Sequence, residues 1–340
     1  MKNNIILVFI IVLIMVLAAC NDNSSNGIEA NSSGSGSTNL AVGGSTSGSV
    51  AFAYSIAIGN LTGSETDGIN MQIQETAGTV DGVRQLIDGG VDIAVSASGT
   101  TIDALNGVGP FEATGEYEDL RLLWNLYPSP FNMVVAENSE IDTPEDFVGK
   151  SIGAGAPGSG SYIMLVDVLE AYGIDVSDVD LQALTPEEQD TAFRDGHLDI
   201  MTFQAGPQTA WLTDLARTRD LKWIQIPEEK FEEMIASQPA GYYVYSELPA
   251  NSYEGQSEPV KTVGANIEWV ANSELDEDTV YEFTKAFWEN KEKADEMHTI
   301  IAQSSIEDAF GSASTEWHPA VIRYLEEVGI EFTEFGSGSD

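Results

Sequence analysis

Cysteine and basic residues are the scarcest components of this chain. Its 340 residues include a single cysteine, Cys20, so no intramolecular disulfide can form. Lysine and arginine number 14 against 55 aspartates and glutamates, which gives a formal net charge of −41. Because binding to nucleic acid phosphates depends on clustered cations, this charge argues against nucleic acid as a partner.

Histidine is also rare, and its placement argues against metal-dependent chemistry. His197, His298 and His318 lie far apart, and the sequence has neither a His-x-x-x-His pair nor a cysteine cluster. His318 precedes Pro319 at an expected helix start and is interpreted as a packing or capping residue. No segment combines a nucleophile, a base and an orienting group, so we expect no catalytic residues, no metal site and no cofactor.

The acidic residues are spread through every segment, which makes the negative charge a property of the whole surface. Self-repulsion on this scale requires screening by salt, so the composition indicates a saline or alkaline habitat. It also weakens the case for any individual carboxylate. Asp175, Asp178 and Asp180 could face a Ca²⁺ ion, but the EF-hand glycine and terminal glutamate are missing, and a solvated face is the preferred interpretation.

The N-terminal residues have the pattern of a bacterial lipoprotein signal. Lys2 precedes an uncharged run from Ile5 to Leu17 that is too short for a comfortable membrane span, and Ala18-Ala19-Cys20 follows. We expect residues 1–20 to be a lipoprotein signal with Cys20 lipidated, and the Gly/Ser/Asn-rich residues 21–39 to be a flexible tether. The folded body would then be extracytoplasmic and anchored to a bacterial membrane. An uncleaved anchor or an incidental cysteine is the alternative.

The segment from Lys150 to Gly173 predicts a strand, a small-residue loop and a helix. Ser151–Ala154 suits a short strand, residues 156–161 read Ala-Pro-Gly-Ser-Gly-Ser, and apolar residues recur at helical spacing over 162–172. The free N–H groups at such a helix start attract an anion without any basic side chain. An ordinary tight turn is the alternative.

The rest of the chain repeats this order of elements. We expect the helix from Val50 to end near Gly59, and Thr185 to Glu188 to form a capping box at the start of a helix that ends at Asp195. Further strands are expected at residues 40–42, 69–73, 91–95, 179–184 and 198–203, a further helix at 79–87, and a loop at 96–99.

An internal sequence repeat points to two lobes. Asp88-Gly89-Gly90-Val91-Asp92-Ile93 matches Asp195-Gly196-His197-Leu198-Asp199-Ile200, each at a similar distance after its own Gly/Ser loop. The repeat predicts two α/β lobes of related topology whose Gly-rich loops face each other across a cleft that can close by hinge motion. Chance recurrence of a frequent turn is the alternative.

The lobe boundaries follow from two apolar segments that read as crossovers, 122–135 and 263–270. We expect lobe 1 to comprise residues 40–126 and 264–332, lobe 2 residues 127–263, and residues 333–340 to be a disordered tail. Helices at 278–290 and 319–328 would pack on lobe 1.

Backbone N–H groups, hydroxyls and the aromatic residues Tyr54, Tyr127 and Phe203 are the expected lining of the cleft. This lining suits the holding of a small anion rather than its chemical conversion. Gly158-Ser159-Gly160 only loosely resembles the Gly-x-Ser-x-Gly elbow of hydrolases.

The chain resembles the TAXI-type solute receptors of tripartite (TRAP) transporters over about residues 40–330. The segments that carry the resemblance are Asn106-Gly107-Val108-Gly109-Pro110-Phe111, Leu126-Tyr127-Pro128-Ser129-Pro130, Gly153 to Ser161, Asp195-Gly196-His197-Leu198-Asp199, and Trp317-His318-Pro319 leading into Arg323-Tyr324. The resemblance implies a two-lobed α/β fold of the type II periplasmic-binding-protein class. It also implies a receptor that closes on a small organic anion and delivers it to a membrane permease driven by an ion gradient.

Dicarboxylates and amino acids such as 2-oxoglutarate or glutamate are the substrates that the resemblance implies. Carried over by position, the ligand-binding residues are Gly48, Ser49, Phe52, Ser98, Tyr127, Ser159, Gly160, Ser161, Phe203, Gln204 and Gly206. In one departure, Val50-Ala51-Phe52 stands where the family usually has a tyrosine pair and a proline, which favours a different or more apolar ligand. Two other functions stay open: the substrate-binding lipoprotein of an ATP-driven (ABC) importer, and a secreted serine hydrolase that uses Ser159.

Overall fold

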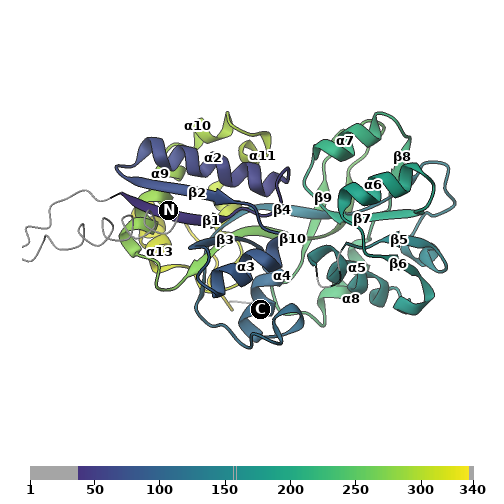
Figure 1. The fold of residues 1–340 in the computed structure, drawn as a ribbon, viewed down its shortest axis with the longest axis horizontal. Coiled ribbons are helices and arrows are strands. Elements are labelled where there is room, and N and C mark those ends of the chain that lie inside the picture. Colours follow the sequence, from purple (N-terminus) through teal and green to yellow (C-terminus); the bar gives the residue numbers. More distant parts are fainter. Residues whose placement is uncertain (1–36, 156, 158, 337–340) are drawn as a thin grey trace, which may run out of the picture. The chain divides into compact units, whose positions relative to one another are not determined.

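The structure, a computed structural model, describes residues 37–155, 157 and 159–336 (Figure 1). The expected signal, Cys20 and most of the expected tether lie outside the described residues, as do residues 337–340 of the expected tail. Thr333, within that expected tail, donates its backbone N–H to the Phe310 carbonyl at 3.0 Å and its hydroxyl to the Gly311 carbonyl at 2.8 Å. Within the described residues, no helix is long and apolar enough to cross a membrane.

Strands and helices alternate along most of the chain, as an α/β fold requires. The strands are β1 (Thr38–Gly43), β2 (Ile69–Gln74), β3 (Ile93–Ala97), β4 (Leu120–Ala136), β5 (Ser151–Gly153), β6 (Asp180–Gln182), β7 (Ile200–Gln204), β8 (Leu221–Trp223), β9 (Val244–Leu248) and β10 (Val260–Asn272). The helices are α2 (Val50–Glu65), α3 (Thr79–Ile87), α4 (Ser98–Asn106), α5 (Gly160–Ala171), α6 (Pro186–Arg194), α7 (Ala210–Ala216), α8 (Glu228–Ile235), α9 (Glu277–Glu289), α10 (Lys291–Asp295), α11 (Thr299–Ala302), α12 (Ile306–Phe310) and α13 (Pro319–Val328). Short 3₁₀ helices lie at Gly109–Phe111, Pro144–Phe147 and Val176–Asp178.

The strand order is β2-β1-β3-β10-β4-β7-β5-β6, with β8 beside β4 and β9 beside β10. In each half the first strand lies between the second and third and runs parallel to both: β1 between β2 and β3, and β5 between β6 and β7. A long antiparallel strand follows, β10 beside β3 and β4 beside β7. This repeated order with an inserted antiparallel strand is the topology of a type II periplasmic-binding-protein-like fold, so the predicted fold class is confirmed.

The long strands β4 and β10 connect the two halves. β4 pairs with β10 as far as Pro130 and with β7 from Phe131 onwards, so one continuous strand serves both sheets. The prolines interrupt neither the strand nor its pairing, since Pro128 lies opposite Asn266 and Pro130 opposite Gly264. The predicted crossover is therefore a 17-residue strand.

The sequence repeat corresponds to a structural repeat. The Asp92 carboxylate accepts the backbone N–H of Ala41 in β1 at 2.8 Å, and the Asp199 carboxylate accepts that of Ser151 in β5 at 2.9 Å. The turn before each aspartate contains a left-handed glycine, Gly89 at φ 73° and Gly196 at φ 74°. Each repeat thus fixes its third strand against its first, which confirms the prediction of two related α/β halves.

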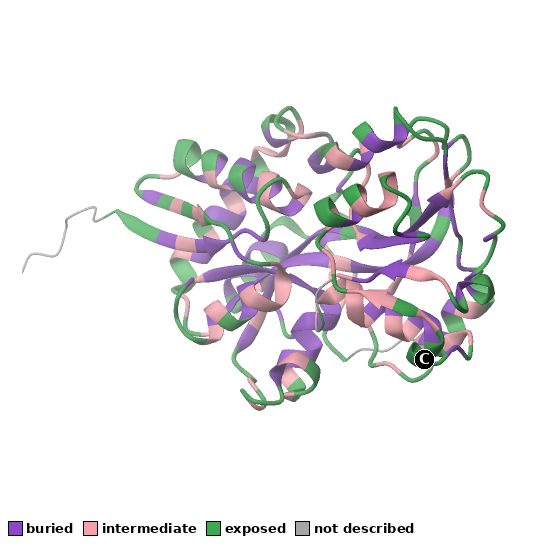
Figure 2. Cartoon of the chain, turned by 45° about the vertical axis from the view of Figure 1, so that its right-hand side comes forward, coloured by how far each residue is buried: buried purple, intermediate pink, exposed green. Residues whose placement is uncertain are grey.

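Helices cover both faces of each sheet, and the core lies between the layers (Figures 1 and 2). In the first half α2 and α9 lie on one face and α3 and α4 on the other; in the second half α6 and α7 lie opposite α5 and α8. Aromatic rings fill the space beneath α9, where Trp124 stacks on Phe287 at a centroid distance of 5.6 Å and also meets Trp269. Figure 2 shows the buried residues concentrated on the strands.

Two predicted boundaries near the first sheet are wrong. α2 continues past Gly59 to Glu65, because a glycine there lets the helix approach β2 closely: a Cβ would lie 3.3 Å from Met71 Cβ. The expected loop at 96–99 does not exist, since β3 extends to Ala97 and α4 begins at Ser98. Buried contacts thus override the turn propensity of small residues.

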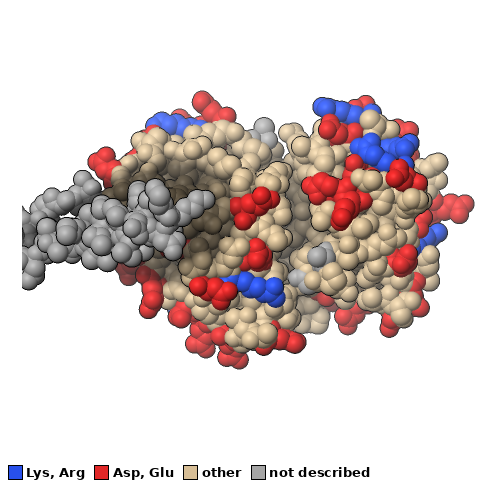
Figure 3. Space-filling model, viewed as in Figure 1, with Lys and Arg blue, Asp and Glu red and all other residues tan. Residues whose placement is uncertain are grey.

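On the face drawn in Figure 3, acidic residues are scattered between larger uncharged areas and outnumber the basic residues. Most of the basic side chains are paired with acids, for example Lys222 with Asp142 at 2.5 Å and Arg323 with Asp278 at 3.1 Å. The distribution of acidic residues on this face agrees with the expectation from composition that the negative charge is spread over the surface.

Candidate functional site

A cavity of about 530 Å³ lies at the carboxyl ends of the parallel strands of both sheets. Loops after β1 and β2 form one wall, and loops after β5, β6 and β7 form the other. The lining residues are Ser45–Ala51, Ala77–Val80, Val95, Tyr127, Ser129, Gly155, Ser159–Ser161, Thr185–Glu187, Gln189, Thr202–Gly206, Thr209–Trp211 and Ile267. This is the position in which open α/β sheets bind ligands.

Most of the predicted ligand-binding residues meet at this cavity. Gly48, Ser49, Tyr127, Ser159, Gly160, Ser161, Phe203, Gln204 and Gly206 all belong to its lining. The structure therefore brings together loops that are up to 158 positions apart in sequence (206 − 48 = 158). Whether these side chains contact a ligand stays a prediction.

Three predicted residues lie elsewhere. Phe52 packs on the loop backbone, where a Cβ at Gly44 would lie 2.9 Å from the Phe52 ring. Ser98 is buried at the start of α4 and donates its hydroxyl to the Tyr242 carbonyl at 3.0 Å. Tyr54 is fully buried behind Tyr127, with 6.3 Å between the ring centroids. These side chains support the wall rather than forming its surface.

The start of α2 forms part of the first wall. Ser49 is the N-cap, and its hydroxyl accepts the Phe52 N–H at 3.1 Å. The preceding loop is tied to the next loop, because the Ser47 hydroxyl donates to the Glu75 carboxylate at 2.6 Å. Ser45 in this loop has φ 77°, an unusual conformation for a residue other than glycine that structures tolerate mainly at functional sites.

The start of α5 faces it from the second wall with the same capping geometry. The N-cap Ser159 has φ −75° and ψ 157°, against −76° and 155° for Ser49, and its hydroxyl accepts the Tyr162 N–H at 3.3 Å. The Ser161 hydroxyl accepts the Gln204 N–H at 3.1 Å, which joins the helix start to the end of β7. A helix start held on both sides in this way presents its remaining N–H groups in fixed directions.

The start of α3 is the third helix end at the cavity, and no side chain caps it. Its N-cap is Gly78, at φ 127°. The Thr79 hydroxyl forms a hydrogen bond of 3.2 Å with that of Thr100 and lies 4.0 Å from the position of a Cβ on Gly160. The starts of α3 and α5 therefore lie close together in the lining of the cavity.

Gln204, in the lining, has a side-chain donor that the described part of the chain leaves unpaired. Its side-chain Nε2 is buried, and it has no hydrogen-bond partner among the described residues. The Oε1 atom of the same amide lies 3.4 Å from the position of a Cβ on Gly160, which places the amide over the start of α5. Burial of an amide N–H without an acceptor costs on the order of 1–3 kcal/mol, so a bound acceptor would stabilise this arrangement.

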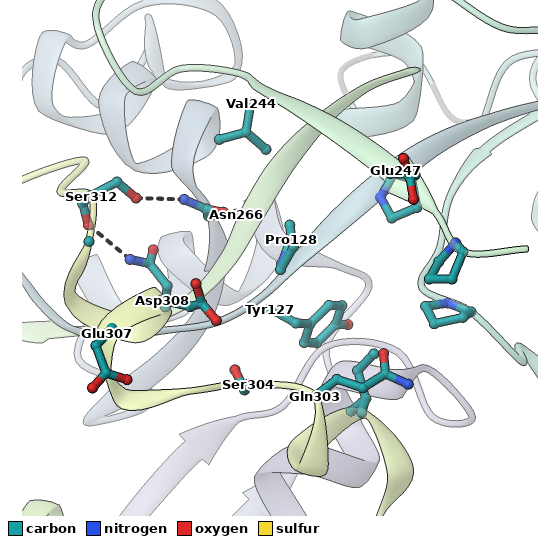
Figure 4. Close-up of a pocket in the computed structure, with 16 residues that line it drawn as sticks. Tyr127, Pro128, Val244, Glu247, Asn266, Gln303, Ser304, Glu307, Asp308 and Ser312 are labelled. Carbon is teal, nitrogen blue, oxygen red and sulfur yellow. Dashed lines mark hydrogen bonds between the residues drawn. The ribbon is translucent and has the colours of Figure 1, made fainter. Parts of the chain in front are cut away.

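Tyr127 closes the cavity toward the interior. Burial raises the pKa of its hydroxyl, which stays neutral. The same ring also borders a second hollow of about 490 Å³, formed by β4, β9, β10, α11 and α12 (Figure 4). In that hollow Glu307 and Asp308 extend from α12 and Glu247 from β9, and the Asn266 amide donates to Ser312 at 2.8 Å.

An aromatic pair forms the apolar part of the second wall. The Trp211 ring meets the Phe203 ring edge-on at a centroid distance of 4.7 Å. The loop between them is held by Tyr253, whose hydroxyl donates to the Gly206 carbonyl at 3.0 Å and accepts the Thr209 N–H at 3.2 Å. This fixes the position of Trp211 at the start of α7.

The charge of the lining is unusual for an anion site. Among the described lining residues there is no lysine, arginine or histidine, and Glu187 is the charged residue. His298 and His318 instead cap α11 and α13 through Nδ1, which confirms the capping interpretation of His318. No group of three or more His, Cys, Asp or Glu in the described part of the chain could hold a metal ion.

Sequence reasoning missed several lining residues, notably Thr79, Gln189 and Trp211. Thr79 could have been predicted from the sequence. It begins a predicted helix directly after a glycine, and the residues at positions 49 and 159, which were predicted to bind the ligand, also stand at helix starts. No sequence pattern indicated Gln189 or Trp211. The Gln189 amide is held at the cavity by two hydrogen bonds to the backbone of Thr202: it accepts the Thr202 N–H at 3.0 Å and donates to the Thr202 carbonyl at 3.1 Å.

Comparison with known proteins gives one family model and several solved structures that match. Residues 42–329 match the model of the NMT1-like family. The periplasmic aliphatic sulphonate binding protein SsuA from Escherichia coli is 16% identical, with 85% of this chain and 82% of that chain covered and a TM-score of 0.48. A putative L-cystine ABC transporter protein from Listeria monocytogenes is 13% identical over 79% of this chain and 98% of its own, with a TM-score of 0.48. A TctC solute binding protein from Polaromonas is 13% identical over 87% of this chain and 90% of its own, also with a TM-score of 0.48. These identities are low, and the fold assignment rests on the strand order instead.

Proposed function

This chain belongs to the NMT1-like family, and from that premise we propose that it is an extracytoplasmic solute-binding receptor for a small organic anion. The receptor captures the anion in the cavity between the two sheets and delivers it to a membrane transporter. The observation that carries the proposal is the convergence of the starts of α2, α3 and α5 on one cavity with an unpaired amide donor. Peptide N–H groups at helix starts bind anions without cationic side chains.

Closure of the cleft is part of the proposal. The strand β4 ends its pairing with β10 at Pro130 and pairs with β7 from Phe131, so the two halves join at this point of the strand. Bending of β4 there would move one wall of the cavity toward the other around a bound anion.

Binding without chemical conversion is the favoured activity. The Ser159 hydroxyl is engaged as a helix cap, and no histidine belongs to the described lining to serve as its base. A serine hydrolase requires such a base within hydrogen-bond reach of the nucleophile. Turnover of ester or amide substrates that a Ser159→Ala variant loses would favour the hydrolase instead.

The transporter that accepts the anion is either an ATP-driven (ABC) importer or the TRAP permease that the sequence resemblance implies. The family match does not separate these two classes. Genes adjacent to this one distinguish them, because an importer of the first class requires an ATPase and the second a large multi-span permease. We further propose that Cys20 carries a lipid anchor that keeps the receptor at the membrane.

Native mass spectrometry tests the proposed function. The purified protein is sprayed under non-denaturing conditions, and any retained small molecule is identified after release. We expect a small organic acid in one-to-one ratio, and its affinity is then measured by calorimetry. A protein that retains no acid, and that binds none from a panel of mono- and dicarboxylates and amino acids, would rule the proposal out.

A further inference from the structure

The lining of the cavity combines polar and apolar groups, and this combination indicates the class of anion. The polar groups include the helix starts and the Gln204 amide described above. The large apolar residues of the lining are Val50, Val80, Val95, Phe203, Trp211 and Ile267. A cavity of about 530 Å³ is also in the range that holds ligands of more than a few heavy atoms.

Trp211 is the largest apolar group of the lining, and its ring is held in place. Phe203, which it contacts, is only 2% exposed and therefore gives a rigid support. Gly206 lies close to two other lining residues, because a Cβ there would be 3.6 Å from the Tyr127 ring and 3.8 Å from a Val50 methyl group. The rigid aromatic surface of Trp211 is suited to packing against a planar or branched hydrocarbon group.

The charge that the cavity can neutralise is limited. A helix start carries roughly half a positive charge, so the starts of α3 and α5 together supply about one. The start of α2 adds roughly another half, so the three helix starts together supply less than the two charges of a dicarboxylate. A second carboxylate on the ligand would find no cationic side chain among the described lining residues, and Glu187 would repel it.

We propose that the ligand is a monocarboxylate with an aromatic or branched apolar body. Its carboxylate lies between the starts of α3 and α5, within reach of the Gln204 amide, and its body packs on Trp211. This inference rests on the proposed function and narrows it, because the dicarboxylates implied by the sequence resemblance carry one charge too many for this lining. The presence of valine and alanine at positions 50 and 51, where the resembled family has tyrosine hydroxyls, is consistent with it.

Calorimetry with three probe acids tests the inference on the intact protein. The probes are 3-phenylpropanoate, 4-methylpentanoate and glutarate, which have similar chain lengths but differ in apolar body and charge. We expect 3-phenylpropanoate to bind at least about tenfold more tightly than glutarate, with 4-methylpentanoate between them. Tighter binding of glutarate than of both monocarboxylates would overturn the inference and leave the proposed function standing.

Substitution of Trp211 locates the binding site of the apolar body. Trp211→Ala should weaken binding of 3-phenylpropanoate by at least about tenfold, and Trp211→Phe by less, because phenylalanine retains an aromatic face. Trp288→Phe, in the core of the first half, is the matched control and should leave affinity unchanged. If the alanine variant fails to fold, the phenylalanine variant carries the test. Equal affinity of wild type and Trp211→Phe for 3-phenylpropanoate would overturn the inference. If wild type binds none of the three probes and no acid of the wider panel, the proposed function itself is overturned.

Discussion

Tyr242, which lies between α8 and β9, donates its hydroxyl to both carboxylate oxygens of Asp103, at 3.0 and 3.1 Å. Its neighbour Tyr243 donates to Asp167 at 2.6 Å. Asp103 belongs to α4 beside the first sheet and Asp167 to α5 beside the second. Two adjacent tyrosines therefore tie the two halves together, and burial raises the pKa of the Asp103 carboxyl to about 6, with a smaller contribution from Asp167.

Removal of the Tyr242 hydroxyl should destabilise the fold in a pH-dependent way. Above pH 6 the Asp103 carboxylate is charged, and the Tyr242→Phe variant leaves it without this donor, so we expect a loss of about 1–3 kcal/mol of unfolding free energy at pH 8. At pH 5 the carboxyl is protonated and the loss should be smaller. Urea unfolding at both pH values measures it, with Tyr245→Phe, whose hydroxyl donates to the Ile226 carbonyl at 3.2 Å, as the control. A loss of equal size at pH 5 and pH 8 would contradict the assignment.

Glu268 should make the protein less stable as pH rises. This carboxyl is fully buried, its Oε1 accepts the hydroxyls of Thr101 and Ser314, and burial raises its pKa to about 7 from 4.5. Because the folded pKa lies above the unfolded one, the stabilising contribution is complete below pH 4.5 and is lost as pH rises through 7.

The Glu268→Gln variant does not titrate and should gain stability relative to wild type between pH 5 and pH 8, on the order of 2–3 kcal/mol. Denaturant unfolding at the two pH values measures the difference. The exposed substitution Glu282→Gln is the matched control. Parallel pH profiles of wild type and Glu268→Gln would show that the buried carboxyl does not titrate in this window.

The helix-start hydroxyls should contribute to ligand affinity. Replacement of Ser159 and Ser161 by alanine removes two hydroxyls from the α5 end of the cavity, and we expect carboxylate binding to weaken by about 1–3 kcal/mol in calorimetry. Ser305→Ala, which removes the N-cap hydroxyl of α12 from the Asp308 N–H at 3.0 Å, controls for the loss of a cap alone. An affinity unchanged from wild type would reject a role for these hydroxyls.

Two glycine substitutions should have opposite effects on stability. A Cβ on Gly153 in β5 would lie 2.5 Å from the Gln189 amide, which is itself bonded to Thr202, so Gly153→Ala should cost about 1–3 kcal/mol. Gly63 lies on the exposed side of α2, and the nearest atom to its Cβ is 4.0 Å away, so Gly63→Ala should stabilise by about 0.5–1 kcal/mol. Thermal unfolding of both variants checks the signs, and a tolerated Gly153→Ala would mean that the amide can move aside.

The lipid anchor makes a prediction about location. Cys20→Ser removes the thiol that acylation requires, so the variant should be recovered in the soluble fraction after cell lysis or in the medium. Fractionation with an antibody against the folded part measures this. Continued retention in the membrane fraction, resistant to carbonate washing, would contradict the lipoprotein interpretation.

The sequence predicted those features that depend on local chemistry. The helices at Thr79–Ile87 and Pro319–Val328 and the capping box at Thr185 follow from spacing and capping residues, and all of them are present. The repeat around Asp92 and Asp199 was also visible, because the same turn and the same carboxylate contact require the same residues.

Features that depend on long-range packing were not predictable. The continuation of α2 beyond Gly59 depends on β2, which the helix reaches only in the folded state. The same holds for the side chain of Ser98, which bonds to Tyr242, 144 positions away. The place of Trp211 in the lining depends on the Tyr253 hydroxyl, which fixes the intervening loop, and no local pattern reports such a contact.

The position of β10 determines how the chain can be divided. It stands between β3 and β4, although 124 positions separate its first residue from the last residue of β4 (260 − 136 = 124). A truncation before Val260 would remove the middle of the first sheet and expose the edge of β3. An expression fragment covering only residues 38–136 would therefore lack the strand that joins β3 to β4. To assemble, it would need a separate peptide that supplies residues 260–333.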